Sequence, residues 1–253
     1  PEFGVTILAA IRGMGDISVG NIVGSNIFNL GFILGGTAII HSLKTSRTVV
    51  FRDGIFLLFG GILLSIFLWD LTLSKIEGIV LFTLLVLYLL YLYFKKEAIE
   101  EEEPTHAMYR WDPILLFVGI GLVIVGSHFL VESAVNIARF MGVSDWVIGA
   151  TIIAAGTSAP EFATSLTAAM KSRYGMSVGN LIGSDIFNLF GVLGIAGIMR
   201  NLSVGIDAQI NLVILSFMIA VVIIFMRTGW VVSRKEGIIL VMIGLLRWIY
   251  SFS

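Results

Sequence analysis

The stretch Pro1–Gly35 reads PEFGVTILAAIRGMGDISVGNIVGSNIFNLGFILG, and Pro160–Gly194 reads PEFATSLTAAMKSRYGMSVGNLIGSDIFNLFGVLG. The second stretch begins 159 residues after the first, and about half of the aligned positions are identical without a gap, which indicates an internal repeat. We call these stretches the first copy and the second copy. Both keep a Pro-Glu pair and a G-N-x-x-G-S-x-I-F-N run inside apolar sequence. Because a carboxylate in hydrocarbon is costly, such a pattern is usually retained for transport.

Composition is typical of a helical membrane protein. Hydrophobic residues make up 57% of the 253 residues and the mean hydropathy is +0.99, whereas soluble domains are about 45–50% apolar. Long uncharged runs of about 20 residues predict membrane-spanning helices. The net charge of −1 points to no nucleic acid or acidic partner, and the absence of cysteine excludes disulfides and thiolate metal sites. No phosphate loop or supported Ser/His/Asp set suggests an enzyme.

The apolar runs predict nine spans and therefore an all-α polytopic bundle. They cover residues 1–13 (a partial helix), 17–41, 50–69, 76–94, 113–137, 147–171, 177–199, 207–227 and 236–253. The charged stretch at 95–112 is interpreted as a solvated linker. A calcium-sensing role is the alternative, but its four consecutive glutamates lack the spacing of calcium ligands.

Lys and Arg residues assign the sides of the membrane. The connections after the second, fourth, sixth and eighth spans carry most of them: Lys44, Arg47, Arg52, Lys95, Lys96, Arg110, Lys171, Arg173, Arg227, Arg234 and Lys235. The other connections carry Arg12, Lys75, Arg139 and Arg200. The positive-inside rule places the first set, with the 95–112 linker, in the cytoplasm of a cell-membrane protein. The two copies then cross the membrane in opposite senses, the inverted topology of secondary transporters.

This arrangement predicts two transmembrane repeats of five helices, 1–94 and 113–253, joined by the 95–112 linker. The second repeat has five spans, with the motif in its second and third. The first repeat has only the end of its second span and three more, so we expect it to lack its first helix and the start of its second. The oligomeric state is left open.

The second copy is preceded by G-T-S-A, so that residues 156–161 read GTSAPE. Proline removes a backbone donor and interrupts a helix, which frees carbonyls near Gly156 and Thr157 to act as ligands where the backbone lines a cavity. Thr157 and Glu161 are four residues apart, so a hydroxyl and a carboxylate share one face. The alternative is a kinked helix whose hydroxyl bonds to its own backbone, but this leaves the glutamate unexplained.

The following helix carries a polar stripe at Asn180, Ser184 and Asn188, spaced i, i+4, i+8. Ordinary packing and hydrogen bonding between helices is the alternative for Asn180. The first copy repeats the pattern at Glu2, Asn21, Ser25 and Asn29. Two inverted copies would bring two carboxylates, amide oxygens, hydroxyls and freed carbonyls to one point. An all-oxygen set with two negative charges suits calcium.

These motifs resemble the α-repeats of the calcium/cation antiporter superfamily, which includes sodium/calcium and proton/calcium exchangers. The resemblance covers nearly the whole chain in helix order. It implies a secondary active antiporter without a cofactor that transports calcium against protons or sodium. It also implies that Glu2 and Glu161 are the central calcium ligands, and that the cation sites are completed by Gly156, Thr157, Ser158, Ser25, Asn29, Ser184 and Asn188.

One departure from the family pattern bears on the counter-ion. Several sodium-coupled members carry aspartate at the position of Asn188, where both copies here have asparagine. Two glutamates hold one calcium or two protons with equal charge, and burial disfavours the charged form of a carboxylate. We therefore predict calcium export in exchange for protons, with sodium/calcium exchange as the alternative and a cation channel as a further one.

Three more polar residues are candidates for an adjacent ion pathway: Asp185, Asn21 and Asn180. Asp185 takes the position of Asn26 and lies about 100° around the helix from Ser184, so it should not share the polar stripe. The alternative for Asp185 is a carboxylate paired or protonated against a neighbouring helix.

Overall fold

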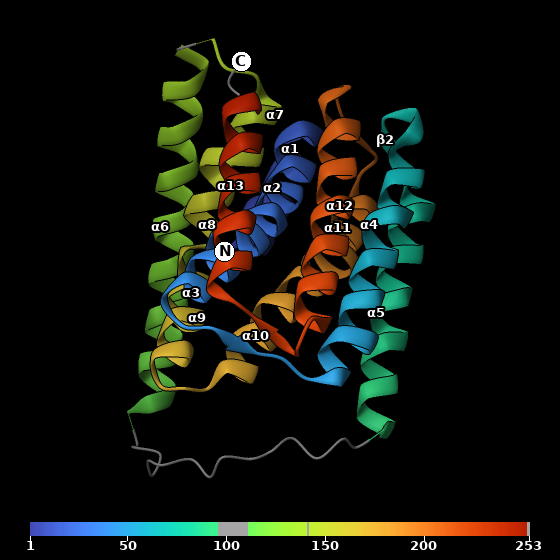
Figure 1. Ribbon diagram of the computed structural model, residues 1–253. Coiled ribbons are helices and arrows are strands. Elements are labelled where there is room, and N and C mark those ends of the chain that lie inside the picture. Colours follow the sequence, from blue (N-terminus) through green and yellow to red (C-terminus); the bar gives the residue numbers. More distant parts are fainter. Residues whose placement is uncertain (96–110, 141, 252–253) are drawn as a thin grey trace.

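The computed structural model describes residues 1–95, 111–140 and 142–251, so most of the predicted 95–112 linker lies outside the described residues. Figure 1 shows a bundle of helices in which α5, α6, α12 and α13 run along one common direction, with α5 and α6 at its two sides, while α2 and α10 cross its middle obliquely. In the described part, five helices are long and apolar enough to cross a membrane: Gly15–Ile40, Val49–Asp70, Lys75–Lys95, Tyr174–Met199 and Asp207–Arg227. The predicted all-α class is confirmed.

Each predicted span is helical in the structure. The helices before the linker are α1 (Glu2–Arg12), α2 (Gly15–Phe28), η1 (Asn29–Leu34), α3 (Gly35–Ile40), η2 (Val49–Gly54), α4 (Ile55–Phe67), η3 (Leu68–Asp70) and α5 (Lys75–Lys95). Those after it are α6 (Asp112–Phe140), α7 (Asp145–Val147), η4 (Ile148–Ile153), α8 (Ala154–Thr157), α9 (Ala159–Met170), α10 (Tyr174–Ile186), η5 (Phe187–Val192), α11 (Leu193–Met199), α12 (Asp207–Arg227) and α13 (Arg234–Ser251). The segments η1, η2, η4 and η5 are π-helical, a form frequent at functional sites.

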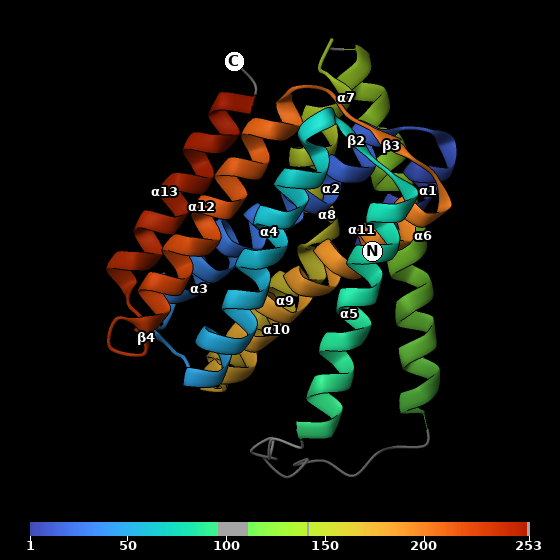
Figure 2. The ribbon, with the colours of Figure 1, turned by 90° about the vertical axis from the view of Figure 1, so that its right-hand side faces the viewer.

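Two short strand pairs show which connections share an end of the bundle. β1 (Leu43–Lys44) pairs antiparallel with β4 (Val231–Val232), and β2 (Thr72–Leu73) pairs antiparallel with β3 (Leu202–Ser203). Figure 2 shows β4 at one end of the bundle and β2 with β3 at the other. Thus α4 runs from the β1–β4 end to the β2–β3 end, and α12, its counterpart in the predicted second repeat, runs back. Opposite directions of counterpart helices are what an inverted repeat requires.

The connections inside the two copies also lie at opposite ends. The loop between α1 and α2 is at the β2–β3 end, where the Gly205 N–H donates to Asp16 Oδ1 at 2.7 Å. The loop between α9 and α10 is at the β1–β4 end, where the Tyr174 ring lies 6.5 Å from that of His41, close to β1. The two loops therefore lie at opposite ends of the bundle.

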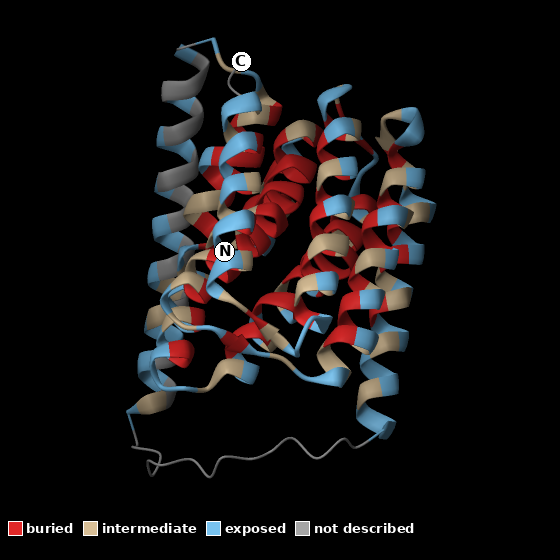
Figure 3. Cartoon of the chain, viewed as in Figure 1, coloured by how far each residue is buried: buried red, intermediate tan, exposed pale blue. Residues whose placement is uncertain are grey.

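Helix α2 lies in the core of the bundle. All of its residues except Asp16 and Phe28 are buried, and Figure 3 shows that burial concentrates on the central helices. A Cβ atom on Gly24 would lie 2.3 Å from the Ala150 carbonyl oxygen on η4. The first copy therefore packs backbone to backbone against the segment that precedes the second copy.

Candidate cation site

The helix that enters the second copy is interrupted, as predicted from Pro160. α8 ends at Thr157 and α9 begins at Ala159, with Ser158 between them at φ −82°, ψ 4°. Because proline has no N–H, the carbonyl of Gly156, four residues earlier, lacks its usual helical donor. A bare carbonyl of this kind is suited to accept a cation.

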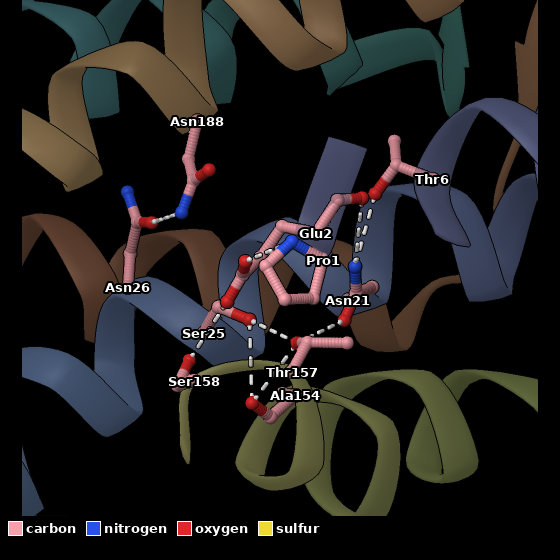
Figure 4. Close-up of polar contacts among 10 residues, drawn as sticks. All are labelled: Pro1, Glu2, Thr6, Asn21, Ser25, Asn26, Ala154, Thr157, Ser158 and Asn188. Atoms are coloured by element: carbon pink, nitrogen blue, oxygen red, sulfur yellow. Dashed lines mark hydrogen bonds and ion pairs between the residues drawn. The ribbon is translucent and has the colours of Figure 1, made fainter. Parts of the chain in front are cut away.

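Glu2 of the first copy meets this interruption. Glu2 is 4% exposed, and the Ser158 hydroxyl donates to Glu2 Oε1 at 3.2 Å (Figure 4). The Thr157 side chain also interacts with the Glu2 carboxylate. The structure thus brings the Glu2 carboxylate of the first copy to two hydroxyls, those of Thr157 and Ser158, that precede the second copy.

The hydroxyl of Thr157 is the centre of a second group of contacts between the copies. Its Oγ1 lies 3.2 Å from Asn21 Oδ1, 3.2 Å from the Ala154 carbonyl and 3.3 Å from Ser25 Oγ. Asn21 in turn donates from Nδ2 to Thr6 Oγ1 at 3.0 Å. Figure 4 shows these side chains converging between α1, α2 and α8. Two of the predicted residues, Asn21 and Ser25, therefore reach across to the segment that precedes the second copy.

Asn29 and Asn188, which stand at the same position of the two copies, make corresponding hydrogen bonds to the opposite copy. Asn29 Nδ2 donates to Asp185 Oδ1 at 2.8 Å, and Asn188 Nδ2 donates to Asn26 Oδ1 at 3.2 Å. With the offset of 159 residues, Asn29 corresponds to Asn188 and Asn26 corresponds to Asp185. The two hydrogen bonds are therefore equivalent in the two copies. Asn26 also donates from Nδ2 to the Asp185 carbonyl at 3.0 Å. Asp185 thus contacts Asn29 of the first copy. The position of Asp185 around its own helix did not predict this contact.

Glu161 and Asn180 differ in how they are engaged. Glu161 interacts with the Ser184 hydroxyl and lies within electrostatic range of Glu2, so the two motif glutamates act on each other. Asn180 instead donates to Thr164 Oγ1 of its own copy at 3.2 Å and is exposed. The structure thus places Ser158 and Thr157 at Glu2 and Ser184 at Glu161. Asn29 and Asn188 contact Asp185 and Asn26 instead, and Asn180 contacts its own copy.

Three buried oxygens of this group have no hydrogen-bond partner among the described residues: Asn29 Oδ1, Glu161 Oε2 and Asp185 Oδ2. Buried polar atoms normally have partners, and acceptors without donors fit a cation. No group of three or more His, Cys, Asp or Glu side chains in the described part is arranged to hold a metal ion. Amide, hydroxyl and carbonyl oxygens must therefore supply part of any coordination shell here.

Three buried polar residues were not predicted to belong to the site or its surroundings. Asn26 could have been found as the counterpart of Asp185, and Thr6 by its position one turn after Glu2 on α1. Arg247 on α13 is 3% exposed, and it donates to Asn211 Oδ1 at 2.9 Å and to the Ala150 carbonyl at 2.7 Å. Its signal was a lone charge inside an apolar span.

The chain matches the model of the sodium/calcium exchanger protein family over residues 1–94 and 111–248. It belongs to that family. A putative antiporter, CaxA, of Alkalimonas amylolytica is 33% identical over 96% of this chain and 80% of its own length. The sodium/calcium exchanger MaX1 of Methanosarcina acetivorans is 29% identical over 96% of this chain and 82% of its own length.

Solved structures of an exchanger show the same fold. The sodium-calcium exchanger NCX_Mj is 30% identical to this chain and superposes with a TM-score of 0.76 over 97% of this chain and 80% of its own. The resemblance drawn from the paired motifs is confirmed. The chain has the fold of a sodium/calcium exchanger-type antiporter and is a membrane protein.

Proposed function

We propose that this family member is a secondary active antiporter that exports calcium through the cell membrane, with the calcium ion held between Glu2 and Glu161. The observation that carries the proposal is the meeting of Glu2 with Ser158 and Thr157 across the two copies. Glu161 supplies the second carboxylate, and its Oε2 has no hydrogen-bond partner among the described residues. Freed backbone carbonyl and hydroxyl oxygens complete the kind of shell that calcium takes.

The counter-ion that the geometry supports best is sodium. Two carboxylates alone would match the charge of one calcium ion or of two protons. Asp185 is a third buried carboxylate, and it lies within electrostatic range of Glu161 and Glu2. With three carboxylates, the negative charge of the site exceeds the charge of one calcium ion or of two protons. Oxygens such as Asn29 Oδ1 can also coordinate a metal ion, whereas a proton needs no such coordination.

Protons remain the second candidate, as predicted from the sequence. The observation that favours them is the pair of glutamates within electrostatic range of each other, because like charges that share a site favour protonation of one of them. Either counter-ion would act by competing with calcium for the same carboxylates. An empty site would leave buried carboxylates uncompensated, which is costly in the membrane interior, and this cost would enforce exchange over leak.

The test is uptake of radiolabelled calcium by proteoliposomes that hold the purified chain. An outward sodium gradient at constant pH should drive calcium accumulation, and a proton gradient without sodium should not. Accumulation driven by the proton gradient alone would assign protons as the counter-ion instead. Calcium flux that needs no opposing gradient would show a channel and contradict the proposal.

A further inference from the structure

Arg247 on α13 carries a buried charge that the proposed exchange does not use. The residue is 3% exposed, and no carboxylate pairs with it among the described residues. Its guanidinium donates from Nε to Asn211 Oδ1 at 2.9 Å and from Nη1 to the Ala150 carbonyl at 2.7 Å, whereas Nη2 has no partner in the described part of the chain. An unpaired cation inside an apolar span is costly, so its presence indicates a function.

The carbonyl that Arg247 contacts lies in the π-helical segment η4. The Ala154 N–H donates to the carbonyls of Gly149 and Thr151, five and three residues before it. In an α-helix the same N–H would donate to Ala150, four residues before it. The Ala150 carbonyl accepts from the Arg247 guanidinium, and a hydrogen bond from a charged donor is stronger than one between neutral groups. This contact therefore favours the π-helical form of η4 over an α-helical one.

The form of η4 sets the direction of the oxygens in the cation site. The Ala154 carbonyl, at the end of η4, lies 3.2 Å from Thr157 Oγ1 and 3.5 Å from Ser25 Oγ. Ser158, which follows, donates to Glu2. A π-helical turn holds about one residue more than an α-helical turn, so its loss would rotate the side chains after it by about 100°. A change of η4 to an α-helix would therefore turn Thr157 and Ser158 away from Glu2.

The counterpart of Arg247 in the first half of the chain is a neutral residue with a charged acceptor. Residues 77–78 and 236–237 both read Glu-Gly at the offset of 159, so Arg247 corresponds to Tyr88 on α5. The Tyr88 hydroxyl donates to Asp53 Oδ1 at 2.6 Å. Arg247 instead donates to an amide oxygen and a backbone carbonyl, both neutral. The charge on α13 is thus directed at the backbone of η4 and is not consumed by an ion pair.

We infer that Arg247 is a positioning residue for the cation site, which acts through the Ala150 carbonyl by holding η4 in its π-helical form. This inference rests on the proposed calcium site at Glu2 and Glu161. The hydrogen bonds of the Arg247 side chain among the described residues go to Asn211 and Ala150. Its influence on calcium therefore passes through the backbone of η4 to the hydroxyls that follow.

The first measurement is amide hydrogen exchange over residues 148–158, which include η4 and α8, in purified wild type and variants. Arg247→Met removes the charge and both hydrogen bonds at similar volume, a replacement that many proteins tolerate. It should raise exchange in this segment and weaken binding of radiolabelled calcium by about tenfold or more, the effect of losing a hydrogen bond to a charged group. Asn211→Ala is the matched control, because it removes the partner on α12 and leaves the bond to Ala150. It should stay close to wild type in both measurements.

A double-mutant cycle with Thr157→Ala separates positioning from general support of the fold. If Arg247 acts by placing the Thr157 hydroxyl, Arg247→Met should weaken calcium binding by a smaller factor in the Thr157→Ala background than in the wild type. A residue that supports packing alone would give the same factor in both. Arg247→Lys keeps a charged donor but loses the fork that serves two acceptors. It takes the place of Arg247→Met in both measurements if the latter does not purify as a folded protein.

The outcomes separate this role of Arg247 from the proposed function. Exchange over residues 148–158 that is unchanged in the Arg247 variant, or raised equally in Asn211→Ala, overturns the inference, as do equal factors in the two backgrounds of the cycle. A wild type that binds no calcium contradicts the proposed function, and the exchange measurement still decides whether Arg247 holds η4.

Discussion

The contact between Gly24 and η4 predicts that Gly24→Ala disables the site without touching a ligand. The added Cβ would lie 2.3 Å from the Ala150 carbonyl oxygen and 2.6 Å from its carbonyl carbon and Cα, where ordinary contact begins at 3.4 Å. These are backbone atoms that cannot rotate away, so α2 and η4 must separate by about 1 Å. Ser25, the next residue, would then leave hydrogen-bonding range of Ala154, whose carbonyl it contacts at 3.5 Å.

The expected magnitude follows from that displacement. Overpacking of this kind costs about 1–3 kcal/mol of folding free energy, and a misplacement of about 1 Å at a working site can lower a rate by about a hundredfold. Sodium-driven calcium uptake and thermal unfolding in detergent measure the two effects. Gly36→Ala is the matched control, because a Cβ on Gly36 in α3 meets nothing within 4 Å. Wild-type uptake and stability for Gly24→Ala would refute the packing argument.

Three further predictions test other parts of the site and the topology. Thr157→Ala should weaken calcium binding about tenfold, since it removes a hydroxyl shared by Asn21, Ser25 and Ala154, whereas Thr157→Ser should bind as wild type; equal binding by both variants would contradict this. A double-mutant cycle of Asn26→Ala and Asn188→Ala should give a coupling of about 0.5–1.5 kcal/mol in unfolding free energy, and additive effects would show that their 3.2 Å hydrogen bond contributes nothing. Because the chain has no cysteine, Glu103→Cys creates a single thiol in the predicted cytoplasmic linker, which an impermeant reagent should label in inside-out vesicles and leave unlabelled in intact cells.

The repeat, the spans and the helix break could be predicted because each depends on local sequence. Apolar length sets the spans, and Pro160 cannot donate a backbone hydrogen bond, so the break between α8 and α9 follows from one residue. The approach of Glu2 to Ser158 was also expected once the copies were taken as inverted.

The role of Asp185 could not be predicted in the same way. A helical wheel places Asp185 around its own helix, but it does not tell which neighbouring helix that face meets. The contact with Asn29 depends on how α10 packs against the first copy, and η1, a π-helical segment, begins at Asn29 itself. A π-helical segment has no simple sequence signature. It has more residues per turn than an α-helix, so it changes the direction in which the following side chains point.

The central claim is that one calcium ion is held by two glutamates, one from each copy. Equilibrium binding of radiolabelled calcium to purified wild type, Glu2→Gln and Glu161→Gln tests it most directly. We expect one saturable site per chain, and either variant should lose it, because each glutamine removes a charged ligand of the same ion. Two sites per chain, with each variant losing only one of them, would contradict it.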